Sequence, residues 1–226
     1  MIRVLPILFN TEMVRAIRDG RKKCTRRIVK IPNCIKQQDD GLYTLFAEGT
    51  CYENQHFEEI VQYLKKPYQP GDILYVRETW GHPISLNSDK QYVFRADKIA
   101  ESGFKNDSHI WYPSIHMPKE AARIWLKVTD VRVERLQEIT EDQAEEEGFL
   151  FTPPCLHLTG ENYCDIDGPC TSEIKFCDMG AGELFGTVLW NSTIKKSDID
   201  RYGWYANPWV WVVEFERCEK PEDNQN

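Results

Sequence analysis

The sequence predicts an α+β fold: a small mixed β-barrel of five or six strands with helices packed at its ends. Two runs, residues 73–80 and 122–134, alternate apolar and polar side chains with the period of two that strands require. The second run slips by one residue near Asp130, which indicates a bulge or bend of the kind that lets a barrel close. Two short segments, residues 11–19 and 139–147, carry helix-capping residues and helical apolar spacing.

The N-terminal segment predicts a strand, a helix and a second strand. Residues 2–8 are an apolar run typical of a buried strand. Asn10 can cap the helix over 11–19, and one apolar helical face is formed by Met13, Val14 and Ile17. Gly20 follows the last helical residue, where glycine most easily adopts the left-handed conformation. Residues 25–30 then predict a strand.

A basic segment covers the end of this helix and the second strand. Residues 15–30 hold eight Lys/Arg and one acid, whereas the chain as a whole carries a formal charge of −8. A basic segment on an acidic protein is a candidate site for an anion or a nucleic acid, and a solvated basic loop is the alternative. The negative total argues against a protein that coats nucleic acid, so RNA would be bound through one local patch. A small nucleoside ligand suits the charge equally well.

Length and composition favour one soluble domain. The chain has 226 residues, 41% of them hydrophobic, which is sufficient for a core. We expect a single domain over residues 1–218 and a disordered polar tail over 219–226. The sequence contains no run approaching the roughly 20 apolar residues of a membrane span and no signal-peptide cleavage site. It therefore predicts a cytoplasmic protein with no membrane partner.

The strand predicted over 73–80 carries a charged side chain on a face that is otherwise apolar. Leu74, Val76, Glu78 and Trp80 share one face, so burial of that face would bury a carboxylate. We expect the basic cluster at residues 22–27 to supply the partner of Glu78, with an exposed strand end as the alternative. Further short strands are predicted at 41–48 and 91–96. The proline-bracketed loop 111–118 places Ser114 and His116 on an otherwise apolar segment, which makes His116 a candidate site residue.

The C-terminal half predicts two helices and a long strand. Thr140 and Gln143 form a capping-box pair, and that helix should end at Gly148 with Glu147 on the face of Gln143 and Ala144. Residues 183–194 predict an amphipathic helix, and 202–209 form an aromatic loop. One face of the last strand carries Trp209, Trp211, Val213 and Phe215.

Residues 150–182 look like a Cys-rich insertion. Four of the chain's eight cysteines lie there, at irregular spacing: Cys155, Cys164, Cys170 and Cys177. Their thiolates can hold a structural zinc ion, and free thiols are the alternative, because no Cys-x-x-Cys pair occurs. Apart from that zinc, no cofactor is expected. A docking surface for a host protein is a further alternative for the insertion, and the oligomeric state is left open.

Several runs resemble the ASCH domain, a relative of the PUA fold. Residues 20–27, Gly-Arg-Lys-Lys-Cys-Thr-Arg-Arg, are similar to the family motif Gly-x-Lys-x-x-Glu/Thr-x-Arg. Residues 70–80 resemble the family's second strand. Similarity to the phage and prophage branch of this family is found in residues 113–118, 131–136, 139–148 and 207–215. Together these runs cover most of the chain outside 31–65 and 150–182.

The resemblance implies an activity and a set of site residues. Some small bacterial ASCH members are N4-acetylcytidine amidohydrolases that use a lysine, a threonine and a downstream glutamate. By similarity these are Lys22, Thr25 and Glu147 here, with Glu147 matched through the looser pattern Ala144-x-x-Glu147. We therefore expect an amidohydrolase acting on an acylated pyrimidine nucleoside or a related small amide. The alternative is a non-catalytic module that binds RNA or a modified base.

The chemistry of this set is coherent. A threonine hydroxyl becomes a nucleophile when a nearby base takes its proton, and Lys22 is three residues away. Glu147 can protonate the departing amine as a general acid. Basic side chains can stabilise an oxyanion or grip a phosphate, and Trp80 or a tryptophan of residues 204–211 can stack on a base. The candidate binding residues are Arg21, Arg26, Arg27, Glu78, Trp80 and His116.

Overall fold

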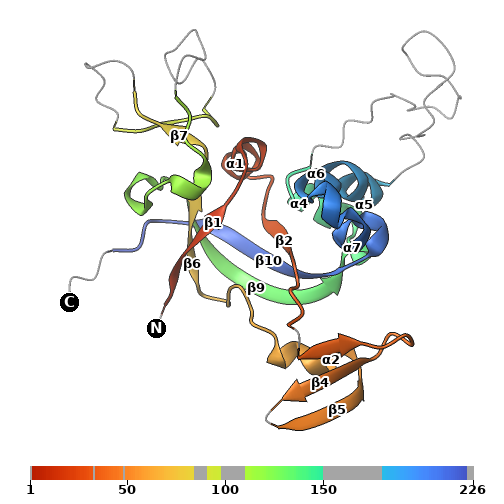
Figure 1. The fold of residues 1–226 in the computed structure, drawn as a ribbon. Coiled ribbons are helices and arrows are strands. Elements are labelled where there is room, and N and C mark those ends of the chain that lie inside the picture. The colour runs from red at the N-terminus through yellow and green to blue at the C-terminus, as the bar shows by residue number, and fades with distance from the viewer. Residues whose placement is uncertain are drawn as a thin grey trace, which may run out of the picture.

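The computed structural model describes residues 2–32, 34–47, 49–83, 91–97, 110–149 and 180–222. Its centre is a five-stranded sheet in which β1 and β6 are parallel and the other neighbours are antiparallel. The order across the sheet is β1 (Val4–Leu8), β6 (Ile73–Arg77), β9 (Trp125–Arg135), β10 (Trp209–Cys218) and β2 (Cys24–Ile28). The long strands β9 and β10 curve together through the middle of the molecule (Figure 1). The predicted α+β class is confirmed.

The sheet is open, so the expected closed barrel is wrong. β1 and β2 are its two edges, and no strand ladder joins them in the part of the chain that the structure describes. Arg3 and Phe9, which flank β1, both bond β6, so in a regular parallel ladder the even-numbered residues of β1 face the free edge. Pro6 is one of these, and a proline has no N–H to offer to another strand.

Side chains, rather than a strand, bond the carbonyls of the free β1 edge. The carbonyl of Leu8 accepts a hydrogen bond from the Arg27 guanidinium at 3.0 Å, and that of Pro6 accepts one from the Tyr68 hydroxyl at 3.0 Å. Arg27 belongs to β2, so the strands approach each other without pairing. These bonds satisfy edge carbonyls that would otherwise need water or another strand.

The predicted bend in β9 is confirmed. The β9–β10 register shifts between Glu214, which faces Asp130, and Phe215, which faces Val128. Thr129 is therefore the extra residue of a bulge, one position from the predicted site.

β10 separates two apolar cores because its side chains alternate. Trp211, Val213 and Phe215 face the larger core, while Val210 and Val212 face the second. The larger core lies under α1 (Thr11–Arg18) and extends to a small sheet with two short helices. These elements are β3 (Ile35–Gln37), β4 (Tyr43–Ala47), β5 (Thr50–Gln55), α2 (Phe57–Ile60) and η1 (Val61–Tyr63).

Short helices cover the second core, and a third, smaller core lies beyond the end of β6. The helices are η4 (Leu136–Glu138), α4 (Glu141–Glu146), α5 (Ala181–Leu184), the π-helical η6 (Phe185–Trp190), α6 (Asn191–Thr193), η7 (Lys196–Asp198), α7 (Ile199–Tyr202) and η8 (Trp204–Ala206). The third core involves β7 (Trp80–Gly81), β8 (Val93–Phe94), η2 (Ser114–His116) and η3 (Lys119–Ala121). Figure 1 shows α4–α7 and the β7 region on opposite sides of α1.

Both predicted helix caps are present. The Asn10 side chain accepts a hydrogen bond from the Met13 amide at 2.8 Å, and Thr140 and Gln143 bond each other's backbone amides in a capping box. The glycines that end α1 and α4, Gly20 and Gly148, have φ of +76° and +83°. The helix predicted over 183–194 corresponds to the run α5–η6–α6.

Three further predictions concern a membrane span, the C-terminal tail and the Cys-rich insertion. No helix in the described ranges is long and apolar enough to cross a membrane. Of the predicted tail, residues 219–222 have no regular secondary structure and the remainder lies outside the description. Most of the predicted insertion, including its four cysteines, also lies outside it, whereas residues 181 and 182 begin α5.

Gly148 packs the end of α4 against α1. A Cβ atom there would lie 2.6 Å from the Ala16 Cβ, whereas a Cβ on Gly20 would meet nothing within 4 Å. We expect Gly20→Ala to cost about 1 kcal/mol of unfolding free energy from its backbone conformation alone. Gly148→Ala should cost roughly 2 kcal/mol more, because helix and turn must also move apart. Urea unfolding of both variants measures this, and equal losses would contradict the packing.

Candidate functional site

The turn after α1 aims Lys22 at the end of α4. The amides of Arg21 and Lys22 both bond the Ala16 carbonyl, at 2.9 and 3.0 Å, which fixes the direction in which the chain leaves the helix. The Lys22 ammonium donates to Glu147 Oε2 at 2.6 Å and to the Glu147 carbonyl at 2.9 Å. The two side chains are 0% and 3% exposed. The lysine and glutamate that the motif pairs by resemblance therefore meet as a buried ion pair.

Backbone contacts hold Glu147 in place. The Lys23 amide bonds the Glu146 carbonyl at 2.7 Å, and the Arg21 guanidinium bonds the Gly148 carbonyl at 2.9 Å. The last carbonyls of a helix lack partners within it, so these bonds satisfy groups that α4 leaves open. The α1–β2 turn thus serves as the C-terminal cap of α4.

Arg26 is a second cation on the same carboxylate. Its guanidinium donates to Glu147 Oε1 at 3.3 Å and to Gln143 Oε1 at 2.6 Å, and it lies 3.5 Å from a carboxylate oxygen of Glu134. Its side chain is 0% exposed. Arg26 was a candidate for substrate or nucleic-acid binding, but in this structure all its contacts are internal.

Thr25 lies on the opposite face of β2 from Arg26. It pairs with Val213, which faces the larger core, whereas Arg26 pairs with Val212, which faces the second core. Thr25 is buried, and no hydrogen bond to its hydroxyl is found among the described residues. Its face of the sheet includes the ring of Phe9, over which Lys22 lies at 5.4 Å and Arg27 at 5.5 Å.

The electrostatics of the cluster follow from its burial. Desolvation, reinforced by the charge of Glu147, raises the pKa of the Cys24 thiol to about 12, with Lys22 and Arg26 opposing the rise. Burial also lowers the pKa of the Arg27 guanidinium, against the raising influence of Tyr68 and Glu147.

Among the described residues, Glu78, Trp80 and His116 make no hydrogen bond or ion pair with the Lys22–Glu147 pair. Glu78 forms a two-pronged ion pair with Arg123, at 2.9 Å for each bond, so the expected partner from residues 22–27 is wrong. Burial raises the pKa of Glu78 and the bonds from Arg123 oppose that rise. Arg123 also bonds Asp97 at 2.6 Å and lies over the Phe94 ring.

Trp80 and His116 differ in burial. Trp80 is buried with Phe94 and Met117, and its ring is flanked by those of Tyr92 and Tyr112. Its role in stacking on a base stays a prediction. His116 ends η2 as an exposed side chain, and none of its contacts reaches the Lys22–Glu147 pair within the described ranges.

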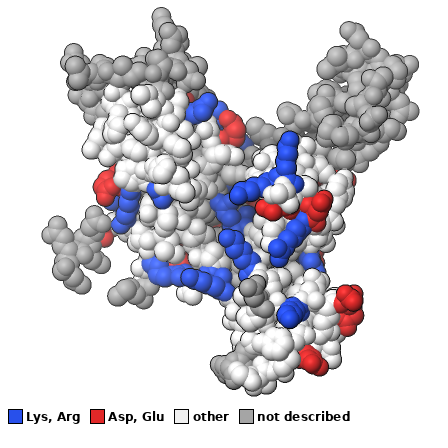
Figure 2. Space-filling view, in the orientation of Figure 1, with Lys and Arg blue, Asp and Glu red and all other residues white. Residues whose placement is uncertain are grey.

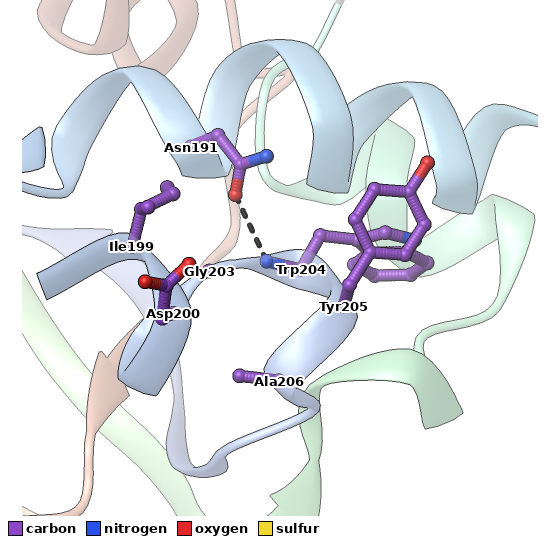
Figure 3. Close-up of a pocket in the computed structure, with 7 residues that line it drawn as sticks. All are labelled: Asn191, Ile199, Asp200, Gly203, Trp204, Tyr205 and Ala206. Carbon is purple, nitrogen blue, oxygen red and sulfur yellow. Dashed lines mark hydrogen bonds between the residues drawn. The ribbon is translucent and has the colours of Figure 1, made fainter.

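A groove lies beside the α1–β2 turn, and a pocket lies in the helical layer. A groove of about 640 Å³ runs between the α1–β2 turn and α4, and its lining includes Arg21, Lys23, Glu145 and Glu146. These are the sequence neighbours of the buried pair, which itself points inward. A pocket of about 260 Å³ lies between α6 and the α7–η8 segment, where Asn191 accepts a hydrogen bond from the Trp204 amide (Figure 3). Trp204, one of the tryptophans predicted to stack on a base, lines that pocket, whereas the predicted catalytic residues do not.

No group of His, Cys, Asp and Glu residues within the described ranges can hold a metal ion. The four cysteines proposed for zinc, Cys155, Cys164, Cys170 and Cys177, lie outside those ranges. Comparisons with known proteins give no match to a family model, a curated protein or a solved structure. The ASCH resemblance therefore stays a prediction that rests on the motifs themselves.

The geometry suits proton transfer between an amine and a carboxylate. At 2.6 Å the Lys22 and Glu147 atoms are within the distance at which a proton passes directly from donor to acceptor. Sequence reasoning missed Gln143 and Phe9 as members of the site. The four-residue spacing of Gln143 and Glu147 on one helix indicated a shared face, whereas nothing in the sequence placed Phe9 beneath Lys22.

The burial of Cys24 beside Lys22, Arg26 and Glu147 predicts that the cysteines differ in their rates of alkylation. Cys24 is buried and its thiol stays protonated at pH 8, because its pKa is about 12, whereas Cys34 and Cys51 are exposed. Treatment with iodoacetamide at pH 8, followed by peptide mapping, should label Cys34 and Cys51 and leave Cys24 at least tenfold less modified. All three should be labelled in urea. Rapid labelling of Cys24 in the folded protein would show that the cluster is open.

Proposed function

We propose that this protein is an amidohydrolase of the PUA-like ASCH type, acting on an N4-acylated cytidine or a related small amide. The observation that carries the proposal is the buried Lys22–Glu147 contact at 2.6 Å, with Thr25 three residues beyond Lys22. A lysine amine serves as a base only when it has lost a proton, and a carboxylate at this distance can accept that proton.

In the proposed reaction, Thr25 Oγ attacks the acyl carbon of the substrate. Its proton passes to the Lys22 amine, whose own proton rests on Glu147, and the tetrahedral intermediate collapses with cleavage of the C–N bond. The departing cytosine amine takes up a proton from the Lys22–Glu147 pair, leaving an acyl ester on Thr25. Water then cleaves that ester, regenerating the hydroxyl and releasing the carboxylic acid, so the net reaction is hydrolysis of one amide.

Burial sets a requirement on substrate entry. Lys22 and Thr25 are enclosed in the resting structure, so a substrate must separate the α1–β2 turn from its neighbours. The Arg21 and Lys23 groove lies on the outer side of that turn. Arg27, on the Thr25 face of β2, is the cation available to the developing oxyanion.

The test is hydrolysis of N4-acetylcytidine to cytidine, followed by chromatography. Thr25→Ser keeps the nucleophile and should retain measurable turnover. Thr25→Val keeps the buried shape but removes the hydroxyl, so it should lower kcat/KM by a factor of about 100 or more. Lys23→Met serves as the control, because Lys23 is exposed and its ion pair with Glu146 lies one position from the buried pair.

Circular dichroism should establish that each variant is folded. No turnover by folded wild-type protein would reject N4-acetylcytidine as the substrate. Equal turnover by Thr25→Val and wild type would reject Thr25 as the nucleophile.

A second candidate function is binding of RNA or a modified base without chemistry, in a protein of phage or prophage origin. It is favoured by the Lys and Arg side chains gathered on the face around α1 and β2 (Figure 2). Lys23 and Lys30 are exposed there, and Arg21 and Arg27 are half-buried. Such a patch would contact phosphates rather than read sequence.

Salt dependence distinguishes this function. If the patch binds RNA, the affinity for a single-stranded oligonucleotide should fall steeply between 50 and 200 mM salt. Replacing Lys23 and Lys30 with glutamine should reduce the slope of log K against log salt concentration by about 1 to 2. Lys127→Gln, on β9, is the matched surface control. An unchanged slope in the double variant would exclude this patch.

A further inference from the structure

Arg26 holds a position that the proposed chemistry does not use. Its side chain is completely buried, although it carries a permanent charge that would otherwise be solvated. It extends from the face of β2 opposite Thr25, toward α4 and the second core. A substrate bound at Thr25 would therefore not touch it, and its effect must pass through the groups that it contacts.

The two oxygens of the Glu147 carboxylate bond two different cations. Lys22 takes Oε2 at 2.6 Å and Arg26 takes Oε1 at 3.3 Å. A carboxylate bound at both oxygens by donors from different directions cannot rotate without breaking one of the bonds. Arg26 therefore determines which oxygen faces Lys22.

Gln143 ties Arg26 to the same helix. Its side-chain oxygen accepts from the guanidinium at 2.6 Å and from the Thr140 amide at 3.2 Å, so the capping box of α4 also anchors Arg26. Glu134 approaches from β9 at 3.5 Å. Arg26 Nε and one oxygen of Glu134 have no hydrogen-bond partner among the described residues.

We propose that Arg26 is a positioning residue, which holds Glu147 so that a single oxygen faces the Lys22 amine. This inference rests on the proposed function and assigns Arg26 a role within the same site. Without the guanidinium, Glu147 can turn both oxygens toward Lys22 or swing away from it. In either case the proton path between the two groups loses its fixed geometry, and misplacement by about 1 Å can cost as much as 100-fold in rate.

The kinetic test compares Arg26→Gln, Arg26→Lys and the matched control Arg3→Gln. The Arg3 guanidinium also binds a buried carboxylate, that of Asp72, but among the described residues it contacts neither Glu147 nor Glu134. With N4-acetylcytidine, Arg26→Gln should lower kcat by roughly 10- to 100-fold with KM changed by less than about threefold. Arg26→Lys should recover part of the loss, and the control should stay within about twofold.

The same substitution in a Glu147→Gln background isolates the pathway. If Arg26 acts only through Glu147, Arg26→Gln should have no further effect on kcat there. A raised KM with unchanged kcat would instead make Arg26 a substrate-binding residue, and full activity in Arg26→Gln would overturn the proposal.

A crystal structure of Arg26→Gln decides the inference independently of activity. We expect the Glu147 side chain to leave its present contact with Lys22 or to occupy two rotamers. A Glu147 that keeps a single rotamer and the 2.6 Å contact would overturn the positioning role, even if wild-type protein hydrolyses the amide. Absence of turnover in wild type would reject the proposed function while this structural comparison still tests Arg26. If Arg26→Gln does not fold, Arg26→Met provides the same comparison, because it also removes the cation.

Discussion

The structure depends on a carboxylate, Glu147, that is buried between two cations. Removing an ion from water costs several kcal/mol, so such a group is stable only where partners satisfy it. Lys22, from the turn after α1, and Arg26, from β2, do so here. The contact therefore brings together residues 125 positions apart and fixes the helical layer to the edge of the sheet.

The open sheet explains why this contact forms where it does. A barrel closed by backbone bonds between β1 and β2 would leave no free edge, but Pro6 withholds an N–H from that edge. The Arg27 side chain, from β2, bonds a carbonyl of β1 across the gap, and Tyr68 bonds another carbonyl of β1. Phe9 lies beneath both Lys22 and Arg27. The seam between β1 and β2 is thus occupied by side chains rather than by a strand ladder, and the candidate site lies beside it.

Local features were predictable from the sequence because their causes are local. The Asn10 cap, the Thr140–Gln143 box and the bulge beside Asp130 each depend on residues a few positions apart, and each is present. The pairing of Lys22 with Glu147 followed from resemblance to a motif.

Long-range choices were not predictable. The alternation of side chains along β6 predicted that Glu78 would share a face with Leu74 and Val76. It did not predict that Arg123 would reach Glu78 from the segment before β9. Similarly, the alternation of side chains along β2 placed Arg26 and Thr25 on opposite faces, but it did not predict that α4 would cover the Arg26 face. Both outcomes depend on how distant elements pack, and an isolated sequence pattern carries no information about that.

The central claim is that Lys22 and Glu147 form a buried, bonded pair, and a double-mutant cycle tests it most directly. Unfolding free energies of wild type, Lys22→Met, Glu147→Gln and the double variant give the coupling energy between the two side chains. The same cycle on Lys23 and Glu146, an exposed pair one position away, is the reference. We predict a coupling of about 2 kcal/mol or more for the buried pair and less than about 0.5 kcal/mol for the exposed one. Additive effects of Lys22→Met and Glu147→Gln would contradict the account.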